Sequence, residues 1–280
     1  MAFAFPCWID NFLVADDVFA QAYDACSPEQ RAVFKTAIAR TAAVCGVGDA
    51  RAFQSQSRMR QGFSCHSLSH PAPWVVLVWD GAYASPARVL AALVPAMLAG
   101  VPNILACRVV RDGTPFPQSI LAALELAGQE RVMECRPEDV QTLVAACCGT
   151  DARGRLILLG RDDVFGDVSS LAAEMGTLTL RYGAAVRIGL ALPSSAESLS
   201  EASLRFAHPD AAFEPFTENA TGRFSAVFCA PAAVQENLNA APLVLSPGEE
   251  GYWAWNGLSL GFFMETAQGI ASGEADISAL

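Results

Sequence analysis

Apolar runs separated by glycine and proline constrain this chain more than any other feature of its sequence. Residues 74–79 are six consecutive apolar side chains, and 156–159 are four more. Continuous runs of this length are typical of strands covered on both faces of a parallel sheet. Segments that begin at proline and end at glycine, such as 86–100, have the composition of helices. This alternation predicts an α/β fold with doubly wound, mainly parallel sheets.

The other elements follow from the same reasoning. We expect further strands at 103–108, 131–135, 155–160, 177–180, 185–192, 224–229 and 243–245. We expect helices at 27–45, 117–128, 137–148, 164–176, 193–205, from Pro231 onward and, amphipathic and last, at 258–270. Ser27 is the expected N-cap of the first helix, because Pro28 and Glu29 follow it. Residues 51–73 are polar, and a loop is expected there.

Composition narrows the classes of function. With 52% hydrophobic and 17% charged residues among 280, the chain can bury a large core, which excludes disorder or a coiled coil as the main architecture. Its net charge of −11 repels phosphate backbones, so nucleic-acid binding is not expected. No basic residue follows Arg223, whereas six acidic residues do, so an anionic membrane is not an expected partner either.

The longest uncharged run, 89–107, has the length of a membrane helix but not its continuity. Residues 100–103 read Gly-Val-Pro-Asn, which predicts a helix, a turn and a strand instead of one span. The N-terminus has no basic residue before Asp10 and does not have the pattern of a signal peptide. We therefore expect a cytoplasmic protein.

Cysteine and histidine give little indication of a metal site. The nine cysteines include no CxxC pair, so reduced, mostly buried thiols are expected. Cys65, His66 and His70 lie close together in the sequence, but Pro71 follows them directly and no fourth ligand is nearby. We expect no metal there.

Two strand ends are candidates for a ligand site. Asp80-Gly81 follows the strand at 74–79, where a doubly wound fold binds anions or cofactors, although a tight βα turn explains the glycine equally well. The segment 159–163 follows the next apolar strand, and its two aspartates favour helix capping over pyrophosphate binding. If a ligand binds, the expected residues are Asp80, Gly81, Ala82, Tyr83 and Ser85 on one wall and Gly160 and Arg161 on the other.

One stretch has an unusual internal pattern. After a turn at Gly81, the helix opens near Ser85 and Pro86, carries Pro95 in its interior, and ends at Ala-Gly-Val. An interior proline removes a backbone hydrogen bond, so this pattern is informative. Together with 22–31, 120–128, 218–228, 242–247 and 256–263, this stretch resembles the histidinol dehydrogenase family, part of the wider aldehyde-dehydrogenase-like group, over roughly residues 20–270.

The resemblance implies a fold of two Rossmann-like units, one inserted in the other. The first would span 72–180 and resemble the nucleotide-binding domain, and the second would combine 10–71 with 181–270. Residues 271–280 would be a frayed tail. The resemblance also implies a homodimer, although the family's C-terminal tail, which gives the partner a zinc ligand, is not matched.

The family oxidises an amino alcohol to an acid with two NAD, using zinc and a Glu-His pair as acid and base. In the matching stretch 206–210, Pro209 stands at the Glu position and Asp210 at the His position, while His208 is displaced by two residues. The segment 192–205, which matches the zinc-ligand segment, contains no His, Cys or Gln, and 159–163 replaces the family's Gly-Pro-Gly-Asn cofactor loop. The differences from the family therefore fall at the positions of its catalytic, zinc-binding and cofactor-binding residues, whereas the segments that resemble its fold are kept.

Three functions remain open. The first is a relative that has lost zinc and histidinol oxidation and binds a small molecule or dinucleotide in the cleft between the units. The second is an active NAD-dependent dehydrogenase on another alcohol or aldehyde, with His208 or Cys229 as the catalytic candidates. The third is a structural or interaction protein without activity. NAD is the one cofactor that the resemblance suggests for a chain without zinc.

Overall fold

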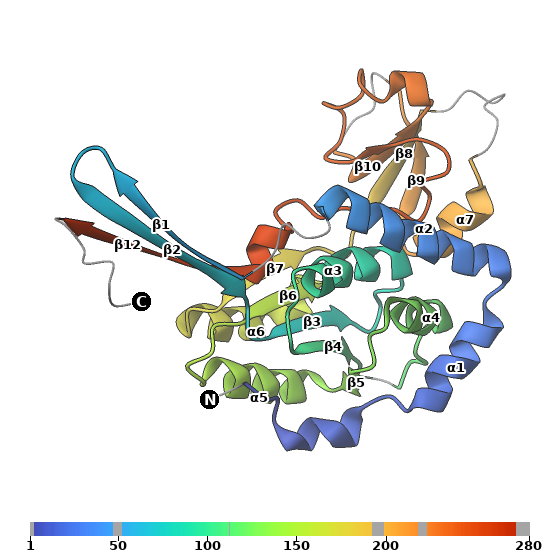
Figure 1. The fold of residues 1–280 in the computed structure, drawn as a ribbon. Coiled ribbons are helices and arrows are strands. Elements are labelled where there is room, and N and C mark those ends of the chain that lie inside the picture. The colour runs from blue at the N-terminus through green and yellow to red at the C-terminus, as the bar shows by residue number, and fades with distance from the viewer. Residues whose placement is uncertain (1–2, 47–51, 112, 192–198, 218–222, 273–280) are drawn as a thin grey trace.

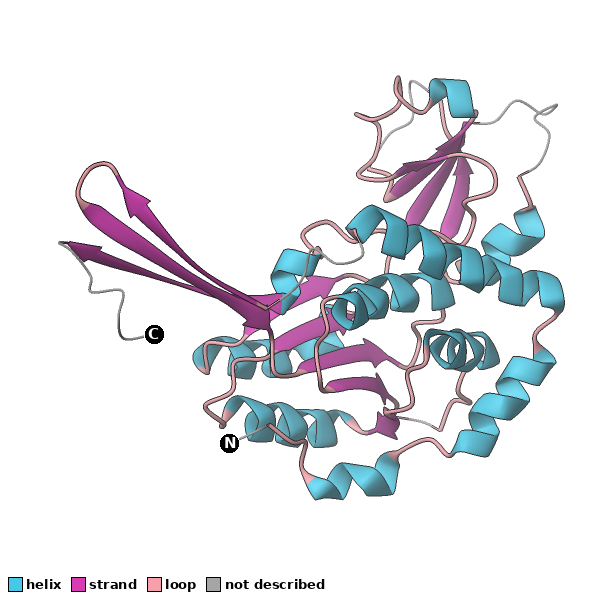
Figure 2. Cartoon of the chain, in the orientation of Figure 1, coloured by secondary structure: helices cyan, strands magenta, loops and turns pink. Residues whose placement is uncertain are grey.

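A computed structural model describes residues 3–46, 52–111, 113–191, 199–217 and 223–272. Within them the chain forms three sheets with the strand orders β5-β4-β3-β6-β7, β11-β10-β8-β9 and β1-β2-β12 (Figures 1 and 2). The first two sheets are parallel throughout, and the third is antiparallel. The predicted α/β fold with mainly parallel sheets is confirmed.

The five-stranded sheet is the centre of the molecule. Its strands, in chain order, are β3 (Val75–Asp80), β4 (Ile104–Val109), β5 (Val132–Cys135), β6 (Arg155–Leu159) and β7 (Leu178–Tyr182). The connecting helices are α3 (Pro86–Leu98), α4 (Gln118–Ala127), α5 (Pro137–Cys148) and α6 (Asp162–Glu174). Every residue of β3 and β6 is buried, as the continuous apolar runs predict for strands covered on both faces.

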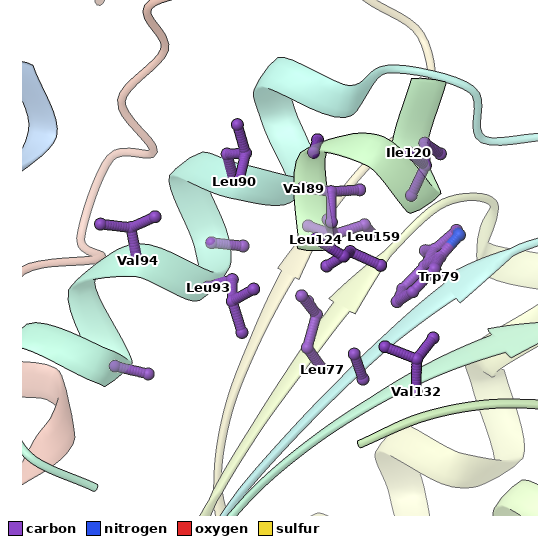
Figure 3. Close-up of a cluster of buried hydrophobic side chains, with 14 of the residues drawn as sticks. Leu77, Trp79, Val89, Leu90, Leu93, Val94, Ile120, Leu124, Val132 and Leu159 are labelled. Atoms are coloured by element: carbon purple, nitrogen blue, oxygen red, sulfur yellow. The ribbon is translucent and has the colours of Figure 1, made fainter. Parts of the chain in front are cut away.

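The two faces of this sheet have separate cores. On one face α3 and α4 cover Leu77 and Trp79 (Figure 3), and on the other α5 and α6 cover Val76 and Val78. Each strand therefore contributes alternate side chains to opposite cores.

The N-terminal segment contains η1 (Cys7–Phe12), α1 (Asp16–Ala25) and α2 (Pro28–Cys45). Ile9 of η1 joins the core on the α5 and α6 side of the sheet, whereas α1 and α2 lie on the α3 and α4 side. α1 packs on α4, α2 packs on α3, and Phe19 and Phe34 join the same core. Ser27 caps α2 as predicted, with its hydroxyl accepting from the Gln30 amide. The division into units at 72 and 180 remains a prediction.

The four-stranded sheet is smaller. It consists of β8 (Arg187–Ala191), β9 (Ala212–Pro215), β10 (Ala226–Cys229) and β11 (Val244–Leu245), with α7 (Glu201–Ala207) between the first two strands. The sequence pattern did not predict β9. The helix expected from Pro231 is a single 3-10 turn, η2 (Pro231–Ala233). The start of the helix expected at 193–205, and the tail at 273–280, lie outside the described residues.

Two segments differ from the sequence-based expectation. The loop expected at 51–73 is a hairpin of β1 (Phe53–Met59) and β2 (Phe63–Pro71). The helix expected at 258–270 is a 3-10 turn, η3 (Leu260–Phe263), followed by β12 (Met264–Ser272), which pairs with β2. Pairing between segments about 200 residues apart overrides the local helical pattern. Together β1, β2 and β12 form an arm that projects from the body (Figure 1).

No helix in the described part of the chain is long and apolar enough to cross a membrane. The uncharged run at 89–107 divides between α3, a turn and β4, as predicted.

Arg155 anchors the arm to the five-stranded sheet. It is the first residue of β6 and is only 4% exposed. Its Nε donates to the Phe262 carbonyl at 2.5 Å and its Nη2 to the Met264 carbonyl at 2.7 Å, while Glu265 lies 3.5 Å from Nη1. Burial lowers the pKa of this guanidinium, and the Glu265 carboxylate partly offsets that effect. The carbonyls and the carboxylate together compensate a charge that would be costly to bury alone.

Arg155→Met is expected to lower the free energy of unfolding by about 3 kcal/mol, because two backbone carbonyls and Glu265 lose their donor. The exposed neighbour Arg153 supplies the control, since Arg153→Met should stay within about 0.5 kcal/mol of the parent. Urea unfolding of the three proteins measures both values. Equal stabilities of the two variants would contradict the anchoring role.

Candidate functional site

The Asp80 carboxylate joins the ends of two strands. Asp80 ends β3 and is 3% exposed. Its Oδ1 accepts from the Ala82 amide at 2.9 Å, and its Oδ2 accepts from the Arg161 amide at 2.8 Å. Arg161 is the N-cap residue of α6. A side-chain carboxylate thus sits at a helix N-terminus, where a bound anion would be favoured.

The glycines beside Asp80 are required by packing. Gly160 has φ +142°, and a Cβ there would lie 2.1 Å from Asp80 Oδ2. A Cβ on Gly81 would lie 2.9 Å from the Val109 carbonyl oxygen. Both positions therefore need glycine for the fold of the turn itself. Gly81→Val would disturb this turn, so it cannot serve as a clean test of ligand binding.

A cavity of about 320 Å³ opens at the carboxyl ends of β3, β4 and β6. Four of the residues predicted for a ligand site line it, namely Asp80, Gly81, Ala82 and Arg161. Arg111 adds a second guanidinium. The Arg161 guanidinium binds the Asp163 carboxylate at 3.1 and 2.8 Å, and this pairing lowers the pKa of Asp163. Both side chains are largely exposed, so their pairing is open to competition from another anion.

Tyr83 and Ser85, also predicted for the ligand site, are fully buried elsewhere. The Ser85 hydroxyl donates to the Ala207 carbonyl at 2.7 Å and accepts from the Arg88 amide at 3.3 Å, which caps α3. The Arg88 guanidinium lies 4.7 Å from the centre of the Tyr83 ring, and burial raises the pKa of this tyrosine. These residues join α3 to the segment that follows α7.

Arg88 and Asp210 form an ion pair that sequence reasoning missed. The Arg88 side chain is 0% exposed, and its Nη2 donates to Asp210 Oδ1. Asp210 Oδ2 accepts from the Ala84 amide at 3.2 Å. Trp255 Nε1 donates to the Arg88 carbonyl at 3.0 Å. An arginine inside an otherwise apolar helix is the signal that could have indicated a buried partner.

His208 is sealed in the same region. Its Nε2 contacts the Glu250 carbonyl at 3.1 Å, its Nδ1 lies 3.3 Å from the Ser85 hydroxyl, and the Trp253 ring packs against it. Burial, reinforced by the nearby charge of Arg88, lowers the pKa of His208 to about 3. The imidazole is neutral at physiological pH and is not exposed to solvent.

Cys229, the other catalytic candidate, ends β10 and is also 0% exposed. Burial raises the pKa of its thiol. The reactive form of cysteine is the thiolate, so this environment does not activate it as a nucleophile.

Cys65, His66 and His70 lie on β2. Neighbours along a strand point to opposite faces, which separates Cys65 from His66. Among the residues that the structure describes, no three His, Cys, Asp or Glu side chains form a group that could hold a metal ion. The stretch 192–198, within the segment that resembles the family's zinc-ligand segment, lies outside them.

Comparisons with known proteins agree with the resemblance. A sequence model of the histidinol dehydrogenase family matches residues 3–152, which is more than half of the chain. The chain therefore belongs to the histidinol dehydrogenase family. Histidinol dehydrogenase from Xanthomonas campestris pv. campestris (strain 8004) is 28% identical over 178 residues, which are 63% of this chain and 39% of that protein. The enzyme from Xanthomonas euvesicatoria pv. vesicatoria (strain 85-10) gives the same values.

The fold comparison covers more of the chain. The crystal structure of histidinol dehydrogenase from Elizabethkingia anophelis has a TM-score of 0.62 and 12% identity, over 93% of this chain and 77% of that one. At this identity the comparison establishes the shared fold. The chain spans about two fifths of the length of the curated relatives it matches.

Gly160→Ala tests the arrangement at Asp80. The added methyl group would displace the buried carboxylate from two amides and would need a φ that L-residues rarely adopt, so we expect a loss of about 3 kcal/mol in unfolding free energy. Gly166→Ala, in α6 with open space around it, is the matched control and should stabilise by up to about 1 kcal/mol. Thermal unfolding compares the two, and a neutral Gly160→Ala would contradict the packing argument.

The sealed imidazole predicts a specific pH dependence. The folded pKa of His208, about 3, lies below the usual 6.5. Between these values the unfolded chain binds one more proton, so the stability from this group is full above pH 6.5 and falls as the pH drops toward 3. Relative to a His208→Gln variant, the parent should lose about 1.4 kcal/mol per pH unit below pH 6.5. Chemical unfolding at several pH values measures the difference, and parallel curves would exclude a neutral buried histidine.

Proposed function

We propose that this chain is a histidinol dehydrogenase family member that binds a small molecule and does not oxidise histidinol. The ion pair between Arg88 and Asp210 carries this proposal. Asp210 stands where the family has its catalytic histidine, and Pro209 stands at the position of the glutamate. Neither residue can take the role that the family assigns to its position.

The Asp210 carboxylate compensates the buried charge of the Arg88 guanidinium. Without this carboxylate the Arg88 guanidinium would be buried with no counter-charge, which is strongly unfavourable. Its second oxygen already accepts an amide hydrogen. His208, two residues earlier, is neutral and sealed from solvent. A general base must reach the proton that it abstracts, but His208 is buried away from solvent and both oxygens of Asp210 already accept hydrogen bonds inside the protein.

The cavity beside Asp80 supports binding of a small anion-bearing molecule. Arg111 and Arg161 provide positive charge at its wall, and its volume of about 320 Å³ is at the lower end of the range for small-molecule pockets. NAD fits this site poorly. The Asp80 carboxylate already accepts from the α6 amide that would bind a pyrophosphate, and the cavity is small for a dinucleotide.

The remaining expectations fit this proposal. The overall negative charge argues against nucleic acid or an anionic membrane as a partner. All nine cysteines are free, which supports a reducing, cytoplasmic location. An active dehydrogenase for another alcohol or aldehyde is the alternative, and the buried thiol of Cys229 weighs against it.

Two measurements test the proposal. With histidinol and NAD, the chain should give no NADH absorbance above the buffer, whereas the Xanthomonas campestris relative, assayed in parallel, serves as the positive control. Histidinol-dependent NADH production that His208→Ala abolishes would overturn the loss of activity. Missing acid–base chemistry alone typically lowers the rate by about 10²–10⁴-fold.

For binding, AMP and inorganic phosphate are the probes, read by thermal unfolding. AMP at about 100 times its dissociation constant should stabilise the parent by about 2.7 kcal/mol. Arg161→Ala should remove this effect, while Arg153→Ala, on a different surface, should keep it. NAD that binds tenfold more tightly than AMP, or an unchanged response of Arg161→Ala, would contradict the assigned site.

A further inference from the structure

Arg108 is a buried arginine within the five-stranded sheet. It is the only charged residue of β4, and its side chain has no exposed surface. Glu134 stands directly opposite on β5, and its carboxylate accepts from Arg108 Nη1 at 2.6 Å. This carboxylate compensates a charge that would be costly to bury alone. An apolar side chain would fill the same place without that cost, so core packing alone does not explain the guanidinium.

The same guanidinium holds two backbone carbonyls. Its Nη1 donates to the Thr114 carbonyl at 2.9 Å, and its Nη2 donates to the Gly81 carbonyl at 3.1 Å. The guanidinium carbon lies 5.1 Å from the centre of the Phe116 ring. Gly81 follows β3 and Thr114 follows β4, so one side chain connects the segments that leave two neighbouring strands.

Both carbonyls belong to residues that line the cavity beside Asp80. Gly81 and Thr114 are part of its wall, whereas Arg108 itself is fully buried. Arg108 therefore fixes the turn after β3 relative to the segment that follows β4. The spacing between these two parts of the wall depends on a side chain that a bound molecule would not touch.

We propose that Arg108 is a positioning residue of this cavity and makes it select anions that carry an organic group. This role rests on the proposed binding of a small anion-bearing molecule. The anionic group is attracted by Arg111 and Arg161, which are exposed at the wall. The organic group fills the space beside Gly81 and Thr114, and walls that are already in place need no ordering on binding. Inorganic phosphate occupies only part of a volume of about 320 Å³, so its affinity does not depend on that spacing.

Arg108→Met tests this role, because it removes both bonds to the cavity wall. It should lower the affinity for AMP by about tenfold or more and that for inorganic phosphate by less than about twofold. Isothermal titration calorimetry on the folded proteins measures both affinities.

Arg155→Met is the matched control. Arg155 is another buried arginine of the same sheet that binds two backbone carbonyls, but neither carbonyl belongs to a residue that lines this cavity. The Arg155→Met variant should lose stability as well, yet it should keep the parent's ratio of AMP to phosphate affinity.

Arg108→Lys separates charge from geometry. Lysine keeps a positive charge for Glu134, but its single nitrogen cannot reproduce the planar fork that holds two carbonyls. This variant should be more stable than Arg108→Met and should still lower the ratio of AMP to phosphate affinity. It also decides the question if Arg108→Met does not fold.

Hydrogen exchange without any ligand gives a second readout. In both Arg108 variants the backbone amides within 81–84 and 113–116 should exchange faster than in the parent, because these segments lose their shared donor. Arg155→Met should leave the exchange of these two segments unchanged.

An unchanged ratio of AMP to phosphate affinity in both Arg108 variants would overturn the role of Arg108. An equal fall of the ratio in Arg155→Met would do the same, since general destabilisation would then explain it. A parent chain that binds neither AMP nor phosphate would overturn the proposed function and the selectivity with it. Hydrogen exchange then decides the positioning role alone: faster exchange at 81–84 and 113–116 supports it, and unchanged exchange overturns it.

Discussion

A buried guanidinium imposes the strongest constraint on this molecule. Arg88 lies in α3 with no exposed side-chain surface, so its charge must be compensated inside the protein. Asp210 supplies the compensation from the turn between α7 and β9, 122 residues away. Ser85 contacts the same segment, through Ala207 and His208. The position of the smaller parallel sheet against the larger one therefore depends on matching one charge.

The same constraint underlies the proposed loss of histidinol oxidation. The aspartate at the position of the family's histidine is bound to an arginine that sits inside the helix. Arg88 is the charged residue of an otherwise apolar helix and precedes Val89 and Leu90. The two residues are interdependent, because either one alone would be a buried or unpaired charge. On the proposed function, the position that matches a catalytic residue of the family serves internal packing in this chain.

The sequence was most informative where one local property decides the structure. Six consecutive apolar residues specified β3, and the Ser27-Pro28 pair specified the start of α2. The sequence was least informative where pairing with a segment far away in the chain determines the secondary structure. The hairpin of β1 and β2 is polar and alternates Ser with Gln, which resembles a loop until β12 pairs with it. β12 has a helical pattern of apolar residues, yet its hydrogen-bonding partner is far away in the sequence.

The candidate site also has a part that the local sequence predicts and a part that depends on distant segments. The order of strand and helix predicted where a cavity opens, and Asp80, Gly81, Ala82 and Arg161 do line it. No spacing in the sequence could indicate that the Ser85 hydroxyl donates to the Ala207 carbonyl, because that contact depends on how α7 packs against α3. Arg88 in an apolar helix indicated that a buried partner exists, but the identity of that partner, Asp210, depends on a segment 122 residues away.

The Asp80 carboxylate has a consequence for how this protein responds to its surroundings. In a phosphate-binding turn the anion comes and goes, and the free amides rearrange or hydrate when it leaves. Here the anion is covalently part of the chain and satisfies the Ala82 and Arg161 amides permanently. The anion-binding position formed by these amides at the ends of β3 and β6 is therefore always occupied by the Asp80 carboxylate. A molecule in the neighbouring cavity therefore meets a turn whose Ala82 and Arg161 amides already have their hydrogen-bond acceptor.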